Sequence, residues 1–429
     1  MSPPGEADMG AIADEELVFT LGSSRKVDLG RAEQELQELW HAAGDEARRQ
    51  GEEGVLRLRE FNFVAYAGGE DMADRISAVV ARLAQRHPGR AIVLLDAGPG
   101  QAGAELVEAW VSAACYRTRE GGRHVCWEQV TVPARGEAVG LLHTAAMRLL
   151  VPELPTVLWW PGEPVLDGHI FRQLGEVSDM VLVDSAGFRD PLGGLVALAG
   201  VAADRSRNFA LDDLNWARLT PWREVTADLF EDPSRRVWLP RIERVLVEYG
   251  SEDTYASPRR ALEPAAARAL LLVGWLASRL GWRPVGDAGQ GDDKALRVRF
   301  ARGTTAEAGE IEVLLAPRET PCGVPGGLVG VHLYVGPAGE ASAPTVLSVT
   351  RMGEACVCAA RVRRGQGGAE ELVRTVDVSP RPEDRLLSEE LDLLGPDPVY
   401  EEALRMAAAL AALPGAQGLR GRQGGVEAC

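Results

Sequence analysis

Short apolar runs of strand length alternate with segments of helical spacing between Phe61 and Asp184, and this alternation limits the fold more than any other feature of the chain. Strands are predicted at 61–67, 91–95, 155–160 and 180–184, and helices at 71–87, 137–150 and 168–174. Strands that alternate with helices in this way form layered α/β domains. We therefore expect an N-terminal α/β layered domain with a mixed sheet over residues 55–186.

Two extended runs, at 105–116 and 124–132, interrupt the alternation and are joined by the polar stretch RTREGGR. A hairpin with Glu120-Gly121 at its tip places Cys115 opposite Cys126, and facing Cβ atoms are roughly 4.5–5.5 Å apart, within reach of a disulfide after local adjustment. Inside a cell such a pair would act as a redox switch. A tip at Gly121-Gly122 shifts the register and separates the two cysteines. A reduced pair of small apolar residues is the alternative interpretation.

Residues 187–413 have a different pattern, which predicts an α+β domain with an antiparallel sheet. Helices are expected at 191–203, 220–230, 264–280, 386–394 and 398–412, and extended runs at 244–249, 296–300, 311–315, 329–334, 346–350 and 356–362. Thr220 is the expected N-cap of the second of these helices, ahead of Pro221.

The two ends of the chain are predicted to be less ordered. Residues 1–54 form an N-terminal extension with a helix expected at 31–50, and the residues before that helix are expected to be loosely attached. Residues 414–429 are rich in glycine and lack an apolar face, so we expect a flexible tail.

Charge excludes two classes of partner. The chain has 63 acidic and 46 basic residues and a formal net charge of −17, so its surface repels phosphate backbones and anionic lipids. The longest strongly apolar stretch, 269–278, is shorter than the roughly 20 residues that a bilayer requires. The start of the chain has neither a basic nor an apolar signal region. We expect a cytoplasmic protein that binds neither nucleic acid nor membrane.

Metal and cofactor signals are weak. The six cysteines form no CxxC motif and the six histidines are scattered, so no metal site is expected. One glycine motif, Gly98-Pro-Gly-Gln-Ala-Gly103, has the GxGxxG spacing of dinucleotide-binding loops and follows a predicted strand. The run after it alternates like a strand, however, so no helix N-terminus is expected to hold a pyrophosphate. No cofactor is therefore predicted, and an enzyme that binds a nucleotide at Gly98–Gly103 remains the alternative.

Two tryptophan-rich segments carry most of the functional information. LPTVLWWPGEP contains Trp159 and Trp160, whose rings must face opposite sides of a strand. DLNWARLTPWRE pairs two tryptophans with two arginines, the residue types that most often anchor protein interfaces. Asp184 ends a strand, where α/β domains place ligands, although an aspartate there can also cap the next turn. The candidate residues for binding a partner or for joining the two domains are Trp159, Trp160, Asp184, Asn215, Trp216, Arg218, Trp222 and Arg223.

These same segments resemble the glucose-6-phosphate dehydrogenase assembly protein family (OpcA). The resemblance rests on LPTVLWWPGEP, MVLVDSAGF and DLNWARLTPWRE in this order, and it continues through LLLVGWLASRLGW and ELDLLGPDPVYEEAL. It covers roughly residues 55–413. The resemblance implies a non-catalytic partner of glucose-6-phosphate dehydrogenase that promotes assembly or allosteric activation of this enzyme, and so supports NADPH metabolism in the oxidative pentose phosphate pathway.

Overall fold

The structure is a computed structural model of the 429-residue chain. It describes residues 17–20, 24–49, 55–56, 59–100, 108–117, 124–251, 262–291, 295–303, 309–319, 327–337, 344–352, 356–365 and 367–416. The chain divides into two compact units, each assembled from separate stretches of sequence. The first unit contains Met1–Asp184, Ser206–Asp212 and Pro382–Pro396, and the second contains Ser185–Arg205, Asp213–Arg381 and Asp397–Cys429.

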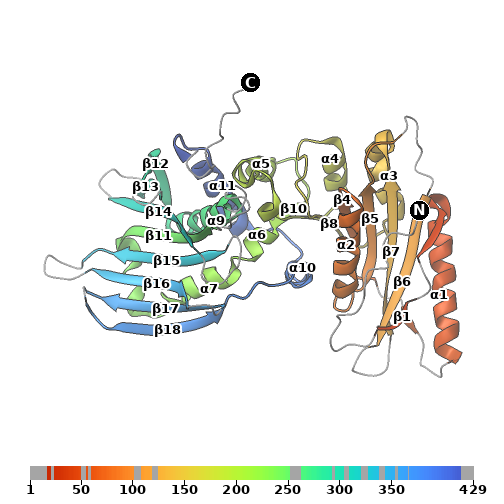
Figure 1. Cartoon of the computed structure of the whole chain (residues 1–429), viewed down its shortest axis with the longest axis horizontal. Helices are drawn as coiled ribbons and strands as arrows, with labels where there is room; N and C mark the ends of the chain where they lie inside the picture. The colour runs from red at the N-terminus through yellow and green to blue at the C-terminus, as the bar shows by residue number, and fades with distance from the viewer. Residues whose placement is uncertain are drawn as a thin grey trace. The chain divides into compact units, whose positions relative to one another are not determined.

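A sheet of mostly parallel strands forms the first unit (Figure 1). Its strands are β1 (Leu17–Thr20), β2 (Arg25–Asp28), β3 (Val55–Leu56), β4 (Phe61–Ala67), β5 (Gly89–Asp96), β6 (Glu108–Arg117), β7 (His124–Ala134), β8 (Thr156–Trp160), β9 (Met180–Val183) and β10 (Ala210–Asp213). Along the sheet the order is β1-β6-β7-β5-β4-β8-β9-β10, with β2 on β6 and β3 on β7. Strands β7, β5, β4, β8 and β9 run parallel, while β6 is antiparallel to β7.

Amphipathic helices complete the first unit. They are α1 (Ala32–Arg49), α2 (Glu70–Leu83), α3 (Leu142–Leu149), α4 (His169–Glu176) and α10 (Glu383–Leu391), with 3-10 turns η1 (Leu29–Arg31) and η2 (Gly136–Leu141). Helix α2 buries Ile76, Val79, Val80 and Leu83, which follow the expected helical spacing. Helix α10 is held to α2 by two ion pairs, Arg75–Glu383 at 2.7 Å and Arg82–Asp384 at 2.9 Å. A segment more than 300 residues away in sequence therefore returns to the first unit.

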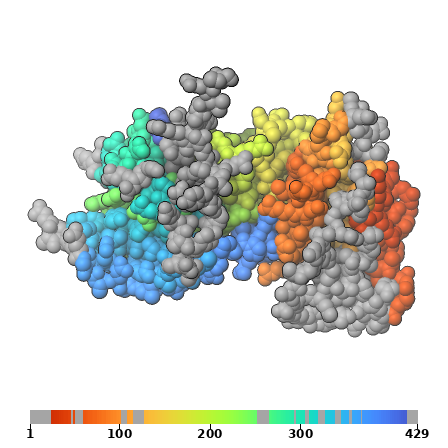
Figure 2. Space-filling view, in the orientation of Figure 1, coloured from red at the N-terminus to blue at the C-terminus, as the bar shows by residue number. Residues whose placement is uncertain are grey.

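The second unit is built on an eight-stranded sheet (Figure 1). Its strands are β11 (Ile242–Ser251), β12 (Trp282–Gln290), β13 (Leu296–Arg302), β14 (Glu310–Glu319), β15 (Leu328–Val335), β16 (Thr345–Arg351), β17 (Val357–Arg364) and β18 (Glu370–Asp377). The order is β12-β13-β14-β11-β15-β16-β17-β18. The expected antiparallel sheet is found with one exception, because β11 pairs with β14 in parallel. In the space-filling view, the strands from β15 onward, coloured cyan to blue, reach the surface (Figure 2).

The helices of the second unit bury long apolar stretches. They are α5 (Pro191–Ala203), α6 (Leu214–Ala217), α7 (Thr220–Asp228), α8 (Pro233–Arg236), α9 (Leu262–Leu280) and α11 (Pro398–Ala411), with 3-10 turns η3 (Ser185–Gly187) and η4 (Leu239–Arg241). Helix α9 ends at Gly281, whose φ of 68° suits glycine at a helix C-terminus. Helix α11 packs so closely on α9 that a side chain at Gly274 would overlap the carbonyl of Ala403. The expected N-cap is wrong: Leu219 precedes α7, and the Thr220 hydroxyl accepts a hydrogen bond from Arg223 instead.

Several segments differ from the organisation expected from the sequence. Strands β1 and β2 pair with β6, so the residues before α1 are not all loosely attached. Residues 206–212 and 382–396, expected in the second domain, belong to the first unit. At the C-terminus, the carbonyl of Pro414 accepts a hydrogen bond from the amide of Ala288, and Ala416 is buried, so the expected flexible tail does not begin at 414. Among the described helices, none combines the length and apolarity needed to cross a membrane.

Candidate functional site

The carboxyl edge of the first sheet is where a doubly wound α/β protein would bind a ligand. If β4 is counted as the first strand and the inserted β6 is left out, the order along the sheet is 3-2-1-4-5-6, which is the order of dinucleotide-binding sheets. At this edge the Tyr66 hydroxyl donates to Asp96 Oδ2 over 3.2 Å, and the Gly98 amide donates to Asp96 Oδ1 over 3.0 Å. Burial raises the pKa of Tyr66, and the nearby Asp96 carboxylate raises it further. Asp96, placed like the ribose-binding acid of such sheets, is therefore engaged by its own chain.

The residues present do not fit a dinucleotide. The turn after the first strand is Gly68-Gly69, and the first turn of α2 carries Glu70 and Asp71, whose carboxylates would repel a pyrophosphate at that helix N-terminus. The expected glycine loop follows β5 instead, and the next described element after it is strand β6. Gly100 packs against Arg135, where an added Cβ would lie 2.7 Å from the arginine Cβ.

Trp159 and Trp160 belong to the interior of the first unit. They lie on β8 and are 0% and 6% exposed. The Trp159 ring packs at 5.9 Å from Phe63, while Trp160 stacks on Tyr66 with ring centroids 4.1 Å apart. The two rings face opposite sides of the strand, as predicted, and each finds its neighbours within the unit. Asp184, directly after β9, is also buried.

In the second unit the DLNWA segment forms a buried polar cluster. Asp213 Oδ1 accepts from the amides of Ser185, at 2.9 Å, and Asn215, at 2.8 Å. The Asn215 side chain donates from Nδ2 to the Ser185 hydroxyl over 3.0 Å and accepts from Arg268 Nε over 2.8 Å. Asn215 is fully buried, so these bonds compensate for the loss of water around its amide.

Trp216 is held through its ring and at its nitrogen. Its Nε1 donates to Asp397 Oδ2 over 2.9 Å, and Asp397 Oδ1 caps α11 by accepting from the amides of Val399 and Tyr400. The guanidinium carbon of Arg223 lies 3.6 Å from the centroid of the indole, a distance suited to a cation–π interaction. The Tyr400 ring lies 5.8 Å from the indole.

The second unit consists of three stretches of chain, and four of their terminal residues contact the DLNWA segment or belong to it. These residues are Ser185, Asp213, Arg381 and Asp397. Ser185 and Asp213 bond to each other and to Asn215, Asp397 bonds to Trp216, and Arg381 Nη2 donates to the carbonyl of Ala217 over 2.8 Å. Of the other predicted residues, Trp222 is buried with Arg351 5.8 Å over its ring, and Arg218 is half-buried. Asn215, Trp216 and Arg223 thus form one cluster, and Trp159, Trp160 and Asp184 lie in the other unit.

The cysteine register is as expected from the sequence. Strands β6 and β7 are antiparallel, and Cys115 pairs with Cys126. Their side chains lie outside the described residues, so their role as a redox pair stays a prediction. Within the described part of the chain, no group of three or more histidine, cysteine, aspartate or glutamate side chains could hold a metal ion.

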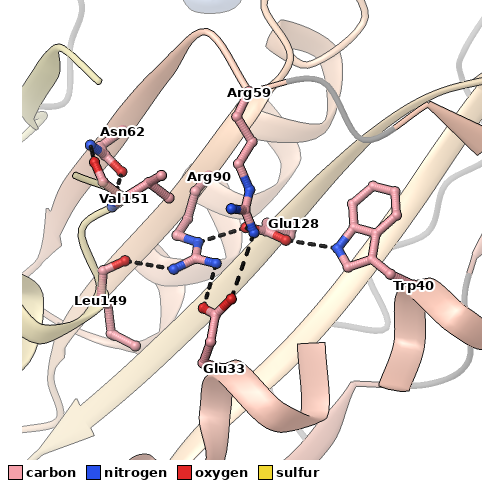
Figure 3. Close-up of polar contacts among 8 residues, drawn as sticks. All are labelled: Glu33, Trp40, Arg59, Asn62, Arg90, Glu128, Leu149 and Val151. Atoms are coloured by element: carbon pink, nitrogen blue, oxygen red, sulfur yellow. Dashed lines mark hydrogen bonds and ion pairs between the residues drawn. The ribbon is translucent and has the colours of Figure 1, made fainter. Parts of the chain in front are cut away.

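A buried ion-pair network, which the sequence analysis missed, lies at the opposite edge of the first sheet (Figure 3). Arg90 Nε donates to Glu128 Oε1 over 2.6 Å, and Glu128 Oε2 accepts from Trp40 Nε1 over 2.8 Å. Arg59 also lies 2.6 Å from Glu128, and Arg90 bonds to Glu33 on α1. A charged residue at the start of an apolar strand, as in Gly89-Arg90-Ala91, was the available signal. The network ties α1 to the sheet.

The fold and the site define a two-unit α/β protein whose first sheet is doubly wound. The carboxyl edge of this sheet, where related folds bind dinucleotides, carries carboxylates. Models described as the glucose-6-phosphate dehydrogenase subunit N-terminal domain and C-terminal domain match residues 80–200 and 209–404. The chain therefore belongs to the glucose-6-phosphate dehydrogenase assembly protein family, OpcA.

Relatives agree with this assignment. OpcA proteins named for the OxPP cycle, from Nostoc punctiforme and Synechococcus elongatus, are each 29% identical to the chain, over 77% and 76% of its length. The aligned chain spans only 66% of the Nostoc relative and 68% of the Synechococcus relative. Among solved structures, a 3-ketoreductase from Actinomadura kijaniata with NADP and TDP-benzene is 12% identical, with a TM-score of 0.44 over 83% of this chain and 97% of that one. So distant a likeness carries no functional argument.

Proposed function

We propose that this chain is a non-catalytic accessory protein that binds glucose-6-phosphate dehydrogenase and promotes its assembly or allosteric activation in the oxidative pentose phosphate pathway. The observation that carries the proposal is the match of two models, both named for a subunit of this dehydrogenase, to residues 80–200 and 209–404. The carboxylates of Glu70 and Asp71 at the dinucleotide edge support a non-catalytic role, because they oppose a bound pyrophosphate.

Activation and assembly differ in their physical requirements. An activator binds the active form of its target more tightly than the inactive form, and a tenfold shift requires about 1.4 kcal/mol of differential affinity. An assembly factor instead stabilises the oligomer by mass action, so its effect depends on concentration. Both mechanisms require a direct complex.

The test is a steady-state assay of the dehydrogenase from the same source, with and without this protein, together with size-exclusion chromatography of the mixture. A raised kcat or lowered KM with co-elution supports activation. A larger dehydrogenase oligomer at unchanged specific activity supports assembly. Neither a rate change nor a complex, under both reducing and oxidising conditions, would contradict the proposal.

The alternative, a nucleotide-binding enzyme, needs a direct binding measurement. Substitution of Gly100 by valine cannot test it, because any side chain at Gly100 meets Arg135 and would disturb the loop for steric reasons. Titration of the unmodified chain with NADPH and NADP, followed by calorimetry, avoids this problem. Saturable binding of either nucleotide would favour the alternative.

A further inference from the structure

The two faces of the second sheet differ in character. One face is fully buried, and its residues are Val245, Val247, Ile311, Val313, Val331, Leu333, Leu347 and Val349. Helix α9, whose buried residues are alanine, leucine and valine, contacts the central strands on this buried face. Helices α7 and α8 lie on the same side, because they pair through Asp228 and Arg235 with Arg374 and Glu371, which stand opposite the buried Ala360 and Val362.

The strand register defines the opposite face, here called the open face, by three rows across the sheet. The first row is Arg299, Glu312, Arg244, Tyr334, Val346, Arg363 and Glu370. The second row is Arg297, Leu314, Leu246, His332, Ser348, Arg361 and Leu372. The third row is Ala316, Glu248, Gly330, Thr350, Ala359 and Thr375. Ala316, Gly330 and Ala359 are buried, so the accessible part of this face lies mainly in the first two rows. Of the described helices, the three discussed in the preceding paragraph, α7, α8 and α9, lie on the buried side of this sheet.

The open face has an apolar middle and a charged rim. Leu246, Tyr334 and Val346 lie near its centre and are half-buried. The residue after each of them on the same strand points to the other face and is buried. Leu372, on the edge strand β18, is 57% exposed. An apolar centre within a polar rim, on a surface this wide, is the usual composition of a protein interface.

Charge on the open face is opposite to that of the whole molecule. In the three rows arginines outnumber glutamates, whereas the chain as a whole has a net charge of −17. Glu312 serves two arginines at once, Arg244 at 3.3 Å and Arg297 at 3.0 Å, so this group keeps one positive charge in excess. Arg299 and Arg361 each lie near one glutamate, Glu310 at 3.9 Å and Glu370 at 3.8 Å. A symmetric pairing of two copies through this face would place arginine-rich rims against each other, which is unfavourable. The charge pattern therefore favours a different, acidic partner.

We propose that the open face of the second sheet is the surface that docks the dehydrogenase, through an acidic region of the dehydrogenase that surrounds an apolar centre. This inference rests on the proposed function and specifies which part of the chain performs it. The buried tryptophan clusters then support the two units from inside, and the contact with the partner is made by arginine side chains and Leu372.

Matched pairs of variants test the proposal on the full chain. Leu372→Asp, on the open face, is compared with Leu393→Asp, which is 74% exposed in the first unit. The double reversal Arg299→Glu and Arg363→Glu is compared with Arg48→Glu and Arg385→Glu on helices α1 and α10 of the first unit. The measurement is biolayer interferometry against the immobilised dehydrogenase at several salt concentrations, with thermal unfolding to verify that each variant folds.

We expect the open-face variants to weaken binding at least tenfold and the control variants to change it less than twofold. The double reversal should mainly slow association and should remove the salt dependence, as rim charges do. Equal affinity of the open-face variants and the wild type overturns the docking surface but leaves the proposed function standing. If the wild type itself does not bind the dehydrogenase, both proposals fail. If the wild type is a dimer that the open-face variants dissociate, the face joins two copies and the inference is wrong.

Discussion

Trp216 Nε1 donates a 2.9 Å hydrogen bond to Asp397, a residue 181 positions further along the chain. The same carboxylate caps helix α11, so one side chain joins the DLNWARL segment to the start of the last helix. The indole is also covered by Arg223 on one side. The tryptophan that the sequence singled out as a possible interface anchor is therefore 2% exposed and holds its own unit together.

Trp216→Phe should destabilise the second unit by about 2–3 kcal/mol, because it removes a hydrogen bond to a charged acceptor and part of a cation–π contact. Chemical unfolding followed by circular dichroism measures the change. Trp238→Phe is the matched control, since Trp238 is half-buried and has Arg364 5.6 Å over its ring. A loss at Trp216 no larger than at Trp238 would mean that the bond to Asp397 contributes little.

Glu128→Gln should destabilise the first unit by about 3–5 kcal/mol, because it leaves the buried Arg90 and its neighbour Arg59 without their shared carboxylate. Glu33→Gln removes a half-exposed partner of the same arginine and should cost about 1 kcal/mol or less. Thermal unfolding of both variants beside the wild type gives the comparison. Equal losses would show that burial of Glu128 does not control the energy of the network.

Stability should decrease in acid through Glu248. Its hydrogen bond with His332, followed by its contact with Arg318, lowers the Glu248 pKa to about 2 from an ordinary 4.5, against an opposing effect of burial. Because the folded pKa is the lower one, this stabilisation is complete above pH 4.5 and disappears as the pH falls toward 2. Partial exposure reduces the contribution to about 1–2 kcal/mol. Glu248→Gln should therefore lose stability at pH 7 and match the wild type near pH 2, while the exposed Glu310→Gln should behave like the wild type throughout.

Trp160→Leu should lower the stability of the first unit by about 1–3 kcal/mol, because the indole stacks on Tyr66 and contacts Phe171 inside the unit. Below its unfolding temperature the variant should bind the dehydrogenase as the wild type does. Titration of the dehydrogenase at a temperature where both proteins are folded measures this. A large loss of affinity without a loss of stability would indicate that Trp160 contacts the dehydrogenase.

Local pattern was enough to predict much of the secondary structure. Strand Phe61–Ala67 and helix Pro191–Ala203 have the predicted bounds, because alternation and apolar content within one segment decide its conformation. The sequence left two registers open for the hairpin, and the structure selects the one that pairs Cys115 with Cys126. The family likewise follows from linear motifs, which need no structure.

Strands β12 and β18 escaped prediction for a local reason. Strand β12 contains a proline and two glycines, and β18 lies exposed at an edge with four charged residues, so neither has an apolar run. Both are strands because a neighbouring strand satisfies their backbone groups.

The sequence by itself determined many of the elements, the family and the candidate residues, because each depends on contiguous residues. Tertiary structure alone decided that β10 and α10 return to the first unit, that β11 and β14 run parallel, and that Trp216 bonds to Asp397. It also decided which sheet face is buried and which carries the arginines. These outcomes depend on desolvation and packing between segments far apart in the chain, and no local pattern records which distant segment will cover a given side chain.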